Sequence, residues 1–129
     1  MEFLKSFDFI IFWMVFMHVI ADYNLQGWLA SAKQKSYWKE NYPDKEMYNN
    51  DWIMALMMHS FTWSFMILIP LIYYKYDAES YLIALVVNTV IHFFVDDLKC
   101  NRFKISLYTD QTAHLLQIVF TWILWGVFV

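Results

Sequence analysis

The stretch WIMALMMHSFTWSFMILIPLIYY, residues 52–74, decides the fold of this chain. It contains no Asp, Glu, Lys or Arg, and it is about as long as the roughly 20 residues that an α-helix needs to cross a bilayer. Three further apolar windows of similar length lie at 7–26, 81–98 and 108–129. The sequence therefore predicts four transmembrane helices.

Composition favours the same class of protein. Of the 129 residues, 60% are hydrophobic and 16% are charged, whereas about a quarter of the residues of a soluble domain are charged. The apolar runs lack the strict alternation of membrane β-barrel strands and are too long for them. We therefore expect one all-α domain over 1–129, a polytopic membrane protein folded as an antiparallel four-helix bundle. The small net charge of −3, mixed in sign, gives no support for nucleic-acid binding.

Basic residues are unevenly divided between the two sides of such a bundle. Alternation of the helices places seven of them on one side: Lys33, Lys35, Lys39, Lys45, Lys99, Arg102 and Lys104. Only Lys5 and Lys75 fall on the other side. By the positive-inside rule, the first and third loops face the cytoplasm and both termini lie outside.

The long first loop, 27–51, is rich in aromatic residues. It contains Trp28, Tyr37, Trp38, Tyr42 and Tyr48 among lysines and acidic residues. Rings at the level of the lipid headgroups suit a segment that lies along the membrane interface, with a short amphipathic helix at 27–40. Such a segment is either a simple membrane anchor or a lid over the cytoplasmic mouth of the bundle.

Each predicted helix also carries one histidine on the side that we assign to the cytoplasm. Three of the histidines have an aspartate one helical turn away: His18 has Asp22, His92 has Asp96 and His114 has Asp110. The fourth, His59, has no such carboxylate. Residues four apart share a helix face, and ionisable groups within a membrane usually face the protein interior. We therefore expect these groups to converge on one site near the cytoplasmic face.

Imidazole and carboxylate groups are the usual ligands of zinc, manganese and ferrous iron, and bundle cores often hold such ions. The predicted divalent-metal ligands are His18, Asp22, His59, His92, Asp96 and His114. A single tetrahedral ion needs fewer ligands than these six residues offer. Either some of the carboxylates orient the histidines, or two metal ions are bound. Asp97 faces about 100° away from Asp96, so we expect it at the surface or paired with Lys99.

The leading hypothesis for function is a metal-dependent hydrolase of a lipid-linked or amphipathic ester at the cytoplasmic leaflet. A metal lowers the pKa of its bound water towards about 7, and Asp110 or Asp22 would act as the catalytic base. Lys33 or Arg102 would hold an anionic headgroup of the substrate. Activated water is favoured over a covalent mechanism because no Ser or Cys lies in a recognisable nucleophile motif.

Several of these residues occur together in an order that resembles a known family. The pattern is His18-x-x-x-Asp22-x-x-x-Gln26, Trp28-Leu29-Ala30, Lys33, His59, His92-x-x-x-Asp96-x-x-Lys99 and Asp110-Gln111-x-x-His114. It is similar to that of the small membrane proteins of bacteria and phages grouped as domain of unknown function 3307, over nearly the whole chain. The resemblance implies a four-helix fold in the bacterial inner (cytoplasmic) membrane and joint importance of these residues. It implies no particular reaction.

Two other functions stay open. The His/Asp chain could conduct protons or metal ions, since histidine titrates near neutral pH. Such a conduit would have to be a homo-oligomer, because the outer halves of the helices are mostly apolar. The protein could instead be a phage-encoded or accessory interaction protein whose polar core only fixes helix register. In that case each interhelical hydrogen bond would contribute about 1 kcal/mol.

Overall fold

The computed structural model describes residues 6–129, so Lys5, one of the two basic residues assigned to the outer side, lies outside the described residues. Within 6–129 every regular element is helical, which confirms the all-α class. Four long segments form the body: α1 (Phe7–Val19) with the π-helix η2 (Ile20–Asn24), α4 (Asp51–Tyr74), α5 (Ala78–Cys100) and α6 (Leu107–Phe128). All four are long and apolar enough to cross a membrane.

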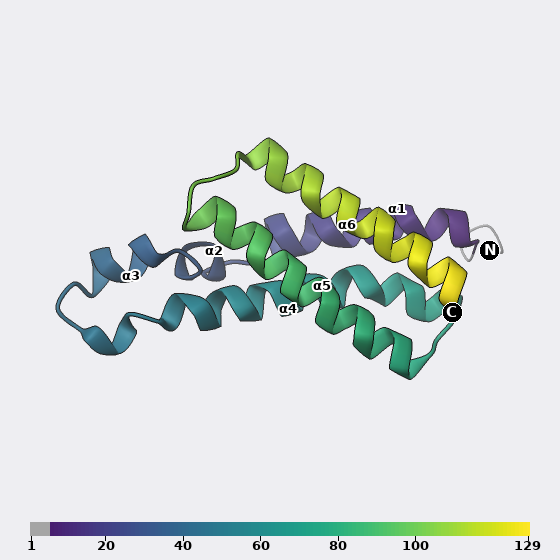
Figure 1. Cartoon of the computed structure of the whole chain (residues 1–129), viewed down its shortest axis with the longest axis horizontal. Helices are drawn as coiled ribbons and strands as arrows, with labels where there is room; N and C mark the ends of the chain where they lie inside the picture. The colour runs from purple at the N-terminus through teal and green to yellow at the C-terminus, as the bar shows by residue number, and fades with distance from the viewer. Residues whose placement is uncertain (1–5) are drawn as a thin grey trace.

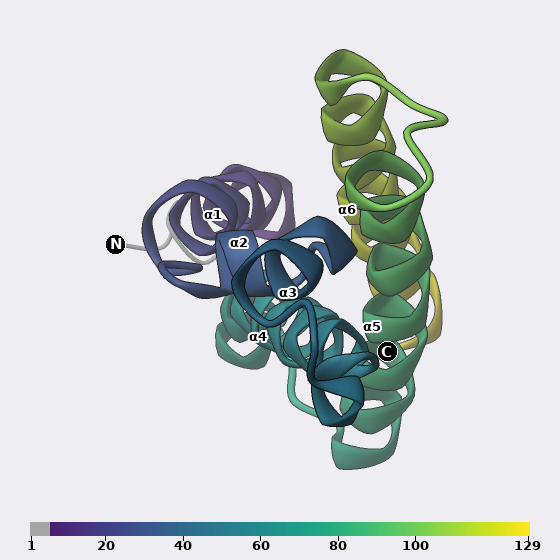
Figure 2. The same cartoon turned by 90° about the vertical axis from the view of Figure 1, so that its left-hand side faces the viewer.

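The four long segments form a closed ring of neighbours. α4 packs against α1 and α5, and α6 packs against α5 and α1. In Figure 1 the chain reverses direction at each connection, so the start of α1 and the C-terminus lie at the same end of the molecule, which we call the termini end. The first loop and the α5–α6 connection lie at the opposite end, the loop end, which faces the viewer in Figure 2.

The first loop is more broken than its sequence predicts. It forms α2 (Leu29–Ala32), α3 (Lys35–Asn41) and the 3-10 helix η3 (Glu46–Tyr48) in place of one amphipathic helix at 27–40. The rings of Trp38, Tyr42 and Tyr48 pack together, with centroid distances between 4.6 and 5.9 Å. The break between α2 and α3 matters because it turns the side chain of Lys33 into the protein.

Side-chain caps define where α5 and α6 begin. The Asp77 carboxylate accepts a hydrogen bond of 2.8 Å from the backbone N–H of Ser80. The Ser106 hydroxyl accepts one of 3.2 Å from the backbone N–H of Thr109. Such caps satisfy N–H groups that a helix leaves without a partner in its first turn. They thereby fix the height at which the histidines of the two helices lie.

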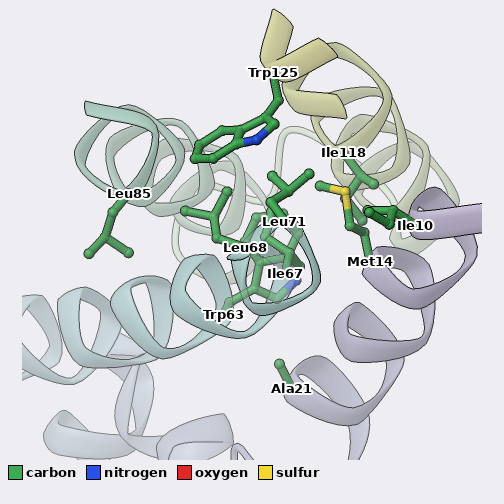
Figure 3. Close-up of a cluster of buried hydrophobic side chains, with 10 residues drawn as sticks. All are labelled: Ile10, Met14, Ala21, Trp63, Ile67, Leu68, Leu71, Leu85, Ile118 and Trp125. Atoms are coloured by element: carbon green, nitrogen blue, oxygen red, sulfur yellow. The ribbon is translucent and has the colours of Figure 1, made fainter. Parts of the chain in front are cut away.

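An apolar core extends from the middle of the molecule to the termini end. Figure 3 shows its residues: Ile10, Met14, Ala21, Trp63, Ile67, Leu68, Leu71, Leu85, Ile118 and Trp125. The outward-facing side chains are apolar as well, and Phe12, Phe16, Phe94 and Phe120 each expose more than half of their surface. This is the reverse of a soluble protein, whose exposed surface rarely carries extensive apolar patches.

Candidate metal centre

The predicted site residues converge between the long helices, in the halves nearest the loop end. α1 and η2 supply His18 and Asp22, α4 supplies His59, α5 supplies His92 and Asp96, and α6 supplies Asp110 and His114. Each of these residues is at most 4% exposed. Groups that are far apart in the sequence thus share one buried region, which we call the His/Asp cluster.

Asp22 lies in the π-helix η2, which widens the end of the first long segment. The backbone N–H of Leu25 donates to the carbonyl of Ile20 at 2.9 Å, one residue further back than in an α-helix. Such wide turns are frequent at functional sites because they shift the side chains that follow. Gly27, with a φ of +46°, lies just beyond this segment in a conformation that glycine adopts without strain.

Imidazole nitrogens and carboxylate oxygens alternate at short range in the cluster. The Nε2 atom of His59 lies 3.3 Å from Asp22 Oδ1 and 3.3 Å from Asp96 Oδ2. The Nε2 atom of His114 likewise lies 3.3 Å from Asp96 Oδ1 and 3.3 Å from Asp110 Oδ1. Asp96 is therefore the central carboxylate, with one oxygen near each of these two imidazoles.

His92 contributes a third Nε2 atom, 3.2 Å from His59 Nε2 and 3.8 Å from Asp96 Oδ2. Two ligands of a tetrahedral ion with bonds of about 2.1 Å lie about 3.4 Å apart, which is close to these separations. Three sets of residues have ligand atoms within 4.8 Å of one another: Asp22, His59 and His92; His92, Asp96 and His114; and Asp22, Asp110 and His114. Any two of these three sets have one residue in common, so the cluster could hold one ion or two neighbouring ions.

Asp22 and Asp110 each have one oxygen held in place and one without a hydrogen bond. The Nε2 atom of Gln111 donates to the Oδ2 atoms of both, at 2.9 and 3.0 Å. The ammonium of Lys99 also donates to Asp110 Oδ2, at 2.6 Å. Both Oδ1 atoms are buried, and each lies 3.3 Å from an imidazole Nε2, that of His59 for Asp22 and that of His114 for Asp110, in a geometry that does not form a hydrogen bond. Burial of such an oxygen is costly, so each Oδ1 atom is suited to a cation or a water molecule.

Two lysines balance most of the negative charge. Lys33 contacts Asp96 Oδ2 at 2.6 Å and its side chain is only 5% exposed, while Lys99 contacts Asp110. With neutral imidazoles, these two ammonium groups and the three carboxylates, including Asp22, carry a formal charge of −1. Because an uncompensated charge in a protein interior is expensive, the cluster favours one more cation, either a proton on a histidine or a metal ion.

His18 is not part of the three sets of ligand atoms. Its Nδ1 atom accepts a 2.8 Å hydrogen bond from the indole N–H of Trp63, and its Nε2 atom lies 3.1 Å from Gln111 Oε1. With Nδ1 accepting, Nε2 carries the proton and donates to Gln111. Both nitrogens are thus engaged, and this geometry does not offer His18 the ligand role that its sequence position predicts. His18 instead orients the amide that holds the two carboxylates.

Trp63 closes the cluster on the side of the apolar core. Its indole stacks on His92, and His92 stacks on His114, with centroid distances of 4.2 Å in both cases. The Nδ1 atoms of these two histidines have no hydrogen-bond partner among the described residues. Stacking therefore takes the place of a hydrogen bond in orienting their rings.

The two cations predicted to hold a substrate headgroup both contact carboxylates of the protein. Lys33 is buried against Asp96, whereas Arg102 contacts Asp97 Oδ2 at 2.7 Å and leaves 60% of its side chain exposed. Asp97 itself is buried. The expectation that Asp97 lies at the surface or pairs with Lys99 is wrong, because Arg102 folds back onto it and Lys99 reaches Asp110.

Asn101 ties the first loop to the end of α5. Its Oδ1 atom accepts a 2.8 Å hydrogen bond from the backbone N–H of Lys35, and its Nδ2 atom donates to the carbonyl of Lys33 at 3.1 Å. These bonds hold the break between α2 and α3 over the cluster. The first loop is thus tied to the loop end of α5, and Lys33 reaches from it into the cluster.

Three residues that contact the cluster were not predicted to do so: Trp63, which no pattern singles out, and Lys99 and Gln111, which belong only to the family pattern or, for Lys99, were expected as a possible partner of Asp97. For two of them the sequence position indicates a place near the cluster, because Lys99 lies three residues after Asp96 and Gln111 directly follows Asp110. Residues three apart lie on neighbouring parts of one helix face. Trp63 carries no such signal, because an aromatic residue in an apolar run is ordinary.

A family model described as "Protein of unknown function (DUF3307)" matches residues 10–128. The chain belongs to this family. The matched range includes every residue of the His/Asp cluster, and the match confirms the resemblance seen in the sequence. No curated protein and no solved structure matches the chain. The description of DUF3307 assigns no reaction, so a function for this member has to be argued from its site.

Proposed function

We propose that this DUF3307 protein is a membrane-embedded, metal-dependent hydrolase of a lipid-linked or amphipathic ester. The observation that carries the proposal is the convergence of buried Nε2 and carboxylate oxygen atoms at separations of 3.2 to 3.8 Å. The formal charge of −1 and the unsatisfied Oδ1 atoms of Asp22 and Asp110 also favour a bound cation. Zinc, manganese and ferrous iron suit this donor set.

In this proposal the four long segments cross the bacterial inner membrane as an antiparallel bundle with the loop end in the cytoplasm. The apolar exterior and the apolar character of all four segments support insertion into a bilayer. The basic residues of the first and third loops support the orientation. His114, seven residues after Leu107, then lies about 10 Å inside the cytoplasmic end of α6.

The residues divide into two roles. His92 and His114 would hold the ion together with Asp96, while His59 belongs to the set with Asp22 and His92 and would serve a second ion. A bound ion would supply a water molecule acidified to a pKa of about 7. Asp22 or Asp110 would accept the proton of that water through its Oδ1 atom, which has no hydrogen bond and lies 3.3 Å from an imidazole Nε2. Addition of water across the acyl–oxygen bond of the ester yields a carboxylic acid and an alcohol.

Arg102 is the better placed of the two cations proposed for an anionic headgroup. More than half of its side chain is exposed at the loop end, so its guanidinium can reach a second anion while it contacts Asp97. Lys33 could reach a headgroup only by leaving Asp96. In the proposed mechanism Lys33 therefore balances charge, and Arg102 binds the substrate.

Element-specific metal analysis of the detergent-purified protein tests this proposal. We expect about one or two zinc, manganese or iron ions per chain, and loss of the metal in His92→Ala and Asp96→Asn. The matched control is Asp8→Asn, which removes an exposed carboxylate near the start of α1 and should leave the metal content unchanged. Absence of metal from protein prepared without chelator, and then offered each ion, would refute a metal-dependent activity.

A second candidate function is a proton or metal-ion conduit. It is favoured by the unbroken series of polar contacts through Lys99, Asp110, His114, Asp96, His59 and Asp22. Against it, Trp63, Ile67 and Ile118 are fully buried between the cluster and the termini end, so conduction would require a homo-oligomer. Proton flux into liposomes that is lost in His114→Ala, in protein that binds no metal, would favour the conduit. Absence of both metal and flux would leave the polar core of an interaction protein.

A further inference from the structure

A polar pocket lies outside the His/Asp cluster, at the loop end, between α3 and the start of α4. Figure 2 shows these two helices side by side at this end of the molecule. The pocket has a volume of about 230 Å³, and we call it the α3/α4 pocket. Its lining consists of Lys35, Trp38, Lys39, Asn49, Asn50 and Trp52. It therefore brings two ammonium groups together with indole rings and side-chain amides, and no carboxylate lines it.

The charge of the pocket differs from that of the loop that forms it. Residues 27–51 contain four lysines and four acidic residues, so the loop as a whole has no net charge. None of the acidic residues lines the pocket; they are Glu40, Asp44, Glu46 and Asp51. Lys35 and Lys39 do line it, and neither forms an ion pair with another residue of 6–129. The lining thus carries a formal charge of +2 without a counter-ion.

The two lysines of the pocket lie one turn apart on α3. Residues at i and i+4 share a helix face, and like charges at this spacing repel each other. The buried or half-buried cations of the loop end differ in this respect, since Lys33 and Lys99 each contact an aspartate. An anion bound between Lys35 and Lys39 would replace their repulsion by attraction. The pocket is therefore suited to a negatively charged group.

Hydrogen bonds and a ring contact hold both walls of the pocket in place. The backbone N–H of Lys35 donates to Asn101 Oδ1 at 2.8 Å, and the indole N–H of Trp38 donates to the Ala32 carbonyl at 2.7 Å. The Lys35 ammonium lies 4.2 Å from the centre of a Trp52 ring. Such a cation–π contact positions the ammonium without neutralising its charge. The pocket is thus largely formed before an anion binds.

Neutral donors add to the two charges. The side-chain amides of Asn49 and Asn50 form no hydrogen bond with another residue of 6–129. Charged and neutral N–H groups therefore surround one small volume, and phosphate oxygens are strong acceptors for both kinds of donor. The volume is below the roughly 300–1,000 Å³ that is typical of sites for drug-sized ligands. It suits a phosphate group with a small substituent better than a nucleotide or a peptide.

We propose that the α3/α4 pocket binds the phosphate group of an anionic membrane phospholipid. Trp52 lies at the start of the apolar run of α4, so in an inserted protein the pocket lies at the level of the headgroups. Indole rings such as those of Trp38 and Trp52 favour this depth, and anionic lipids attract lysines there. The position of the pocket in the cytoplasmic leaflet rests on the orientation in the proposed function, whereas its affinity for phosphate does not.

Native mass spectrometry of the detergent-purified protein with two added lipids tests the proposal. Dioleoylphosphatidylglycerol and dioleoylglycerol have the same acyl chains, and only the first carries a phosphate group. We expect the wild type to prefer the phosphatidylglycerol. In the double variant Lys35→Gln with Lys39→Gln the preference should fall by about thirtyfold, which is about fivefold for each lysine. Neither lysine is ion-paired in the ligand-free protein, so the variant should fold and still bind dioleoylglycerol.

The matched control removes two exposed lysines of the loop end that do not line the pocket, Lys45→Gln with Lys104→Gln. It has the same net charge as the pocket variant and should keep the preference to within about twofold. Equal losses in the two double variants would overturn the proposal, because the lipid would then respond only to the overall charge of the loop end. A wild type that does not distinguish the two lipids would overturn it as well.

Inorganic phosphate offers the same chemistry without acyl chains, so it separates a lipid from a soluble ligand. If a phospholipid is the ligand, inorganic phosphate at about a hundredfold excess should leave most of the phosphatidylglycerol bound, since it lacks the apolar burial of the chains. If inorganic phosphate displaces the lipid from the wild type, the assignment to a phospholipid is overturned and the pocket is a site for a soluble phosphate compound.

The outcome for the pocket can be separated from that for the proposed function. Lys35 and Lys39 do not contact the His/Asp cluster, so their double variant should keep the metal content of the wild type. If the protein binds no metal but the two double variants differ in lipid preference, the pocket stands and the hydrolase does not. If the protein binds metal and the two double variants do not differ, the pocket proposal fails while the hydrolase stands.

Discussion

Removal of the Lys33 ammonium is the most informative single perturbation of the His/Asp cluster. In Lys33→Met, Asp96 loses a 2.6 Å ion pair with a lysine side chain that is 5% exposed, while the apolar stem of the side chain is largely kept. The formal charge of the cluster changes from −1 to −2. Breaking a buried pair by removing one partner costs about 3–5 kcal/mol, so we expect the metal-free variant to be less stable than the wild type by that amount.

The same substitution should make the protein more dependent on metal. A divalent ion would supply the missing positive charge, so zinc or manganese should restore most of the lost stability in Lys33→Met. The ion should stabilise the variant by more than it stabilises the wild type. The double variant Lys33→Met with Asp96→Asn removes both charges, and it should be more stable than Lys33→Met alone when metal is absent.

Thermal unfolding in detergent, with and without chelator, measures these differences. Lys39→Met is the control, since it removes an exposed lysine from the same loop and should change stability by less than about 0.5 kcal/mol. If Lys33→Met unfolds at the same temperature as Lys39→Met, the ion pair does not stabilise the cluster and the charge argument fails. An equal response of wild type and Lys33→Met to added metal would show that the ion does not bind near Asp96.

Three further predictions concern other parts of the fold. Gly126→Ala would place a Cβ atom in steric conflict with the ring of Phe7, so thermal unfolding should show a loss of about 1–3 kcal/mol that Phe7→Leu largely reverses. Gln111→Leu releases the two carboxylates that its amide holds, and competition with a chelator should show metal affinity lowered by about 10–100-fold. Asn101→Ala frees the backbone of the first loop, and hydrogen exchange of the Lys35 amide should become about fivefold faster while metal content is unchanged.

Two of the four long segments could be predicted to within one residue at each end, whereas α5 (Ala78–Cys100) is longer than the predicted 81–98 and the first segment ends at Asn24 instead of residue 26. α4 spans Asp51–Tyr74 where the sequence predicts 52–74, and α6 spans Leu107–Phe128 where it predicts 108–129. A run of apolar residues of this length has few alternatives, because its backbone groups must all be satisfied internally. The spacing of four between His92 and Asp96 likewise fixes their common helix face from local geometry alone.

Features that depend on distant contacts could not be predicted in this way. The position of Lys33 beside other basic residues suggests an exposed lysine, yet it is buried by a contact with Asp96, 63 positions away. His18 resembles the other histidines in sequence, and only the hydrogen bonds from Trp63 and to Gln111 separate it from the ligand sets. The π-helix η2 could not be predicted either, because it depends on the backbone N–H of Leu25 donating to the carbonyl of Ile20 instead of that of Ala21.

The distribution of the cluster over all four long segments has a consequence for biosynthesis. In the proposed membrane protein, each long segment would enter the bilayer carrying a histidine with at least one partner on another segment, so no nascent hairpin would contain all the contacts of the cluster. Insertion and assembly of membrane helices are separate stages, and here the second stage cannot be completed until α6 has left the ribosome. In the proposed membrane protein, a chain truncated before Asp110 would therefore leave ionisable groups of the cluster without partners on α6.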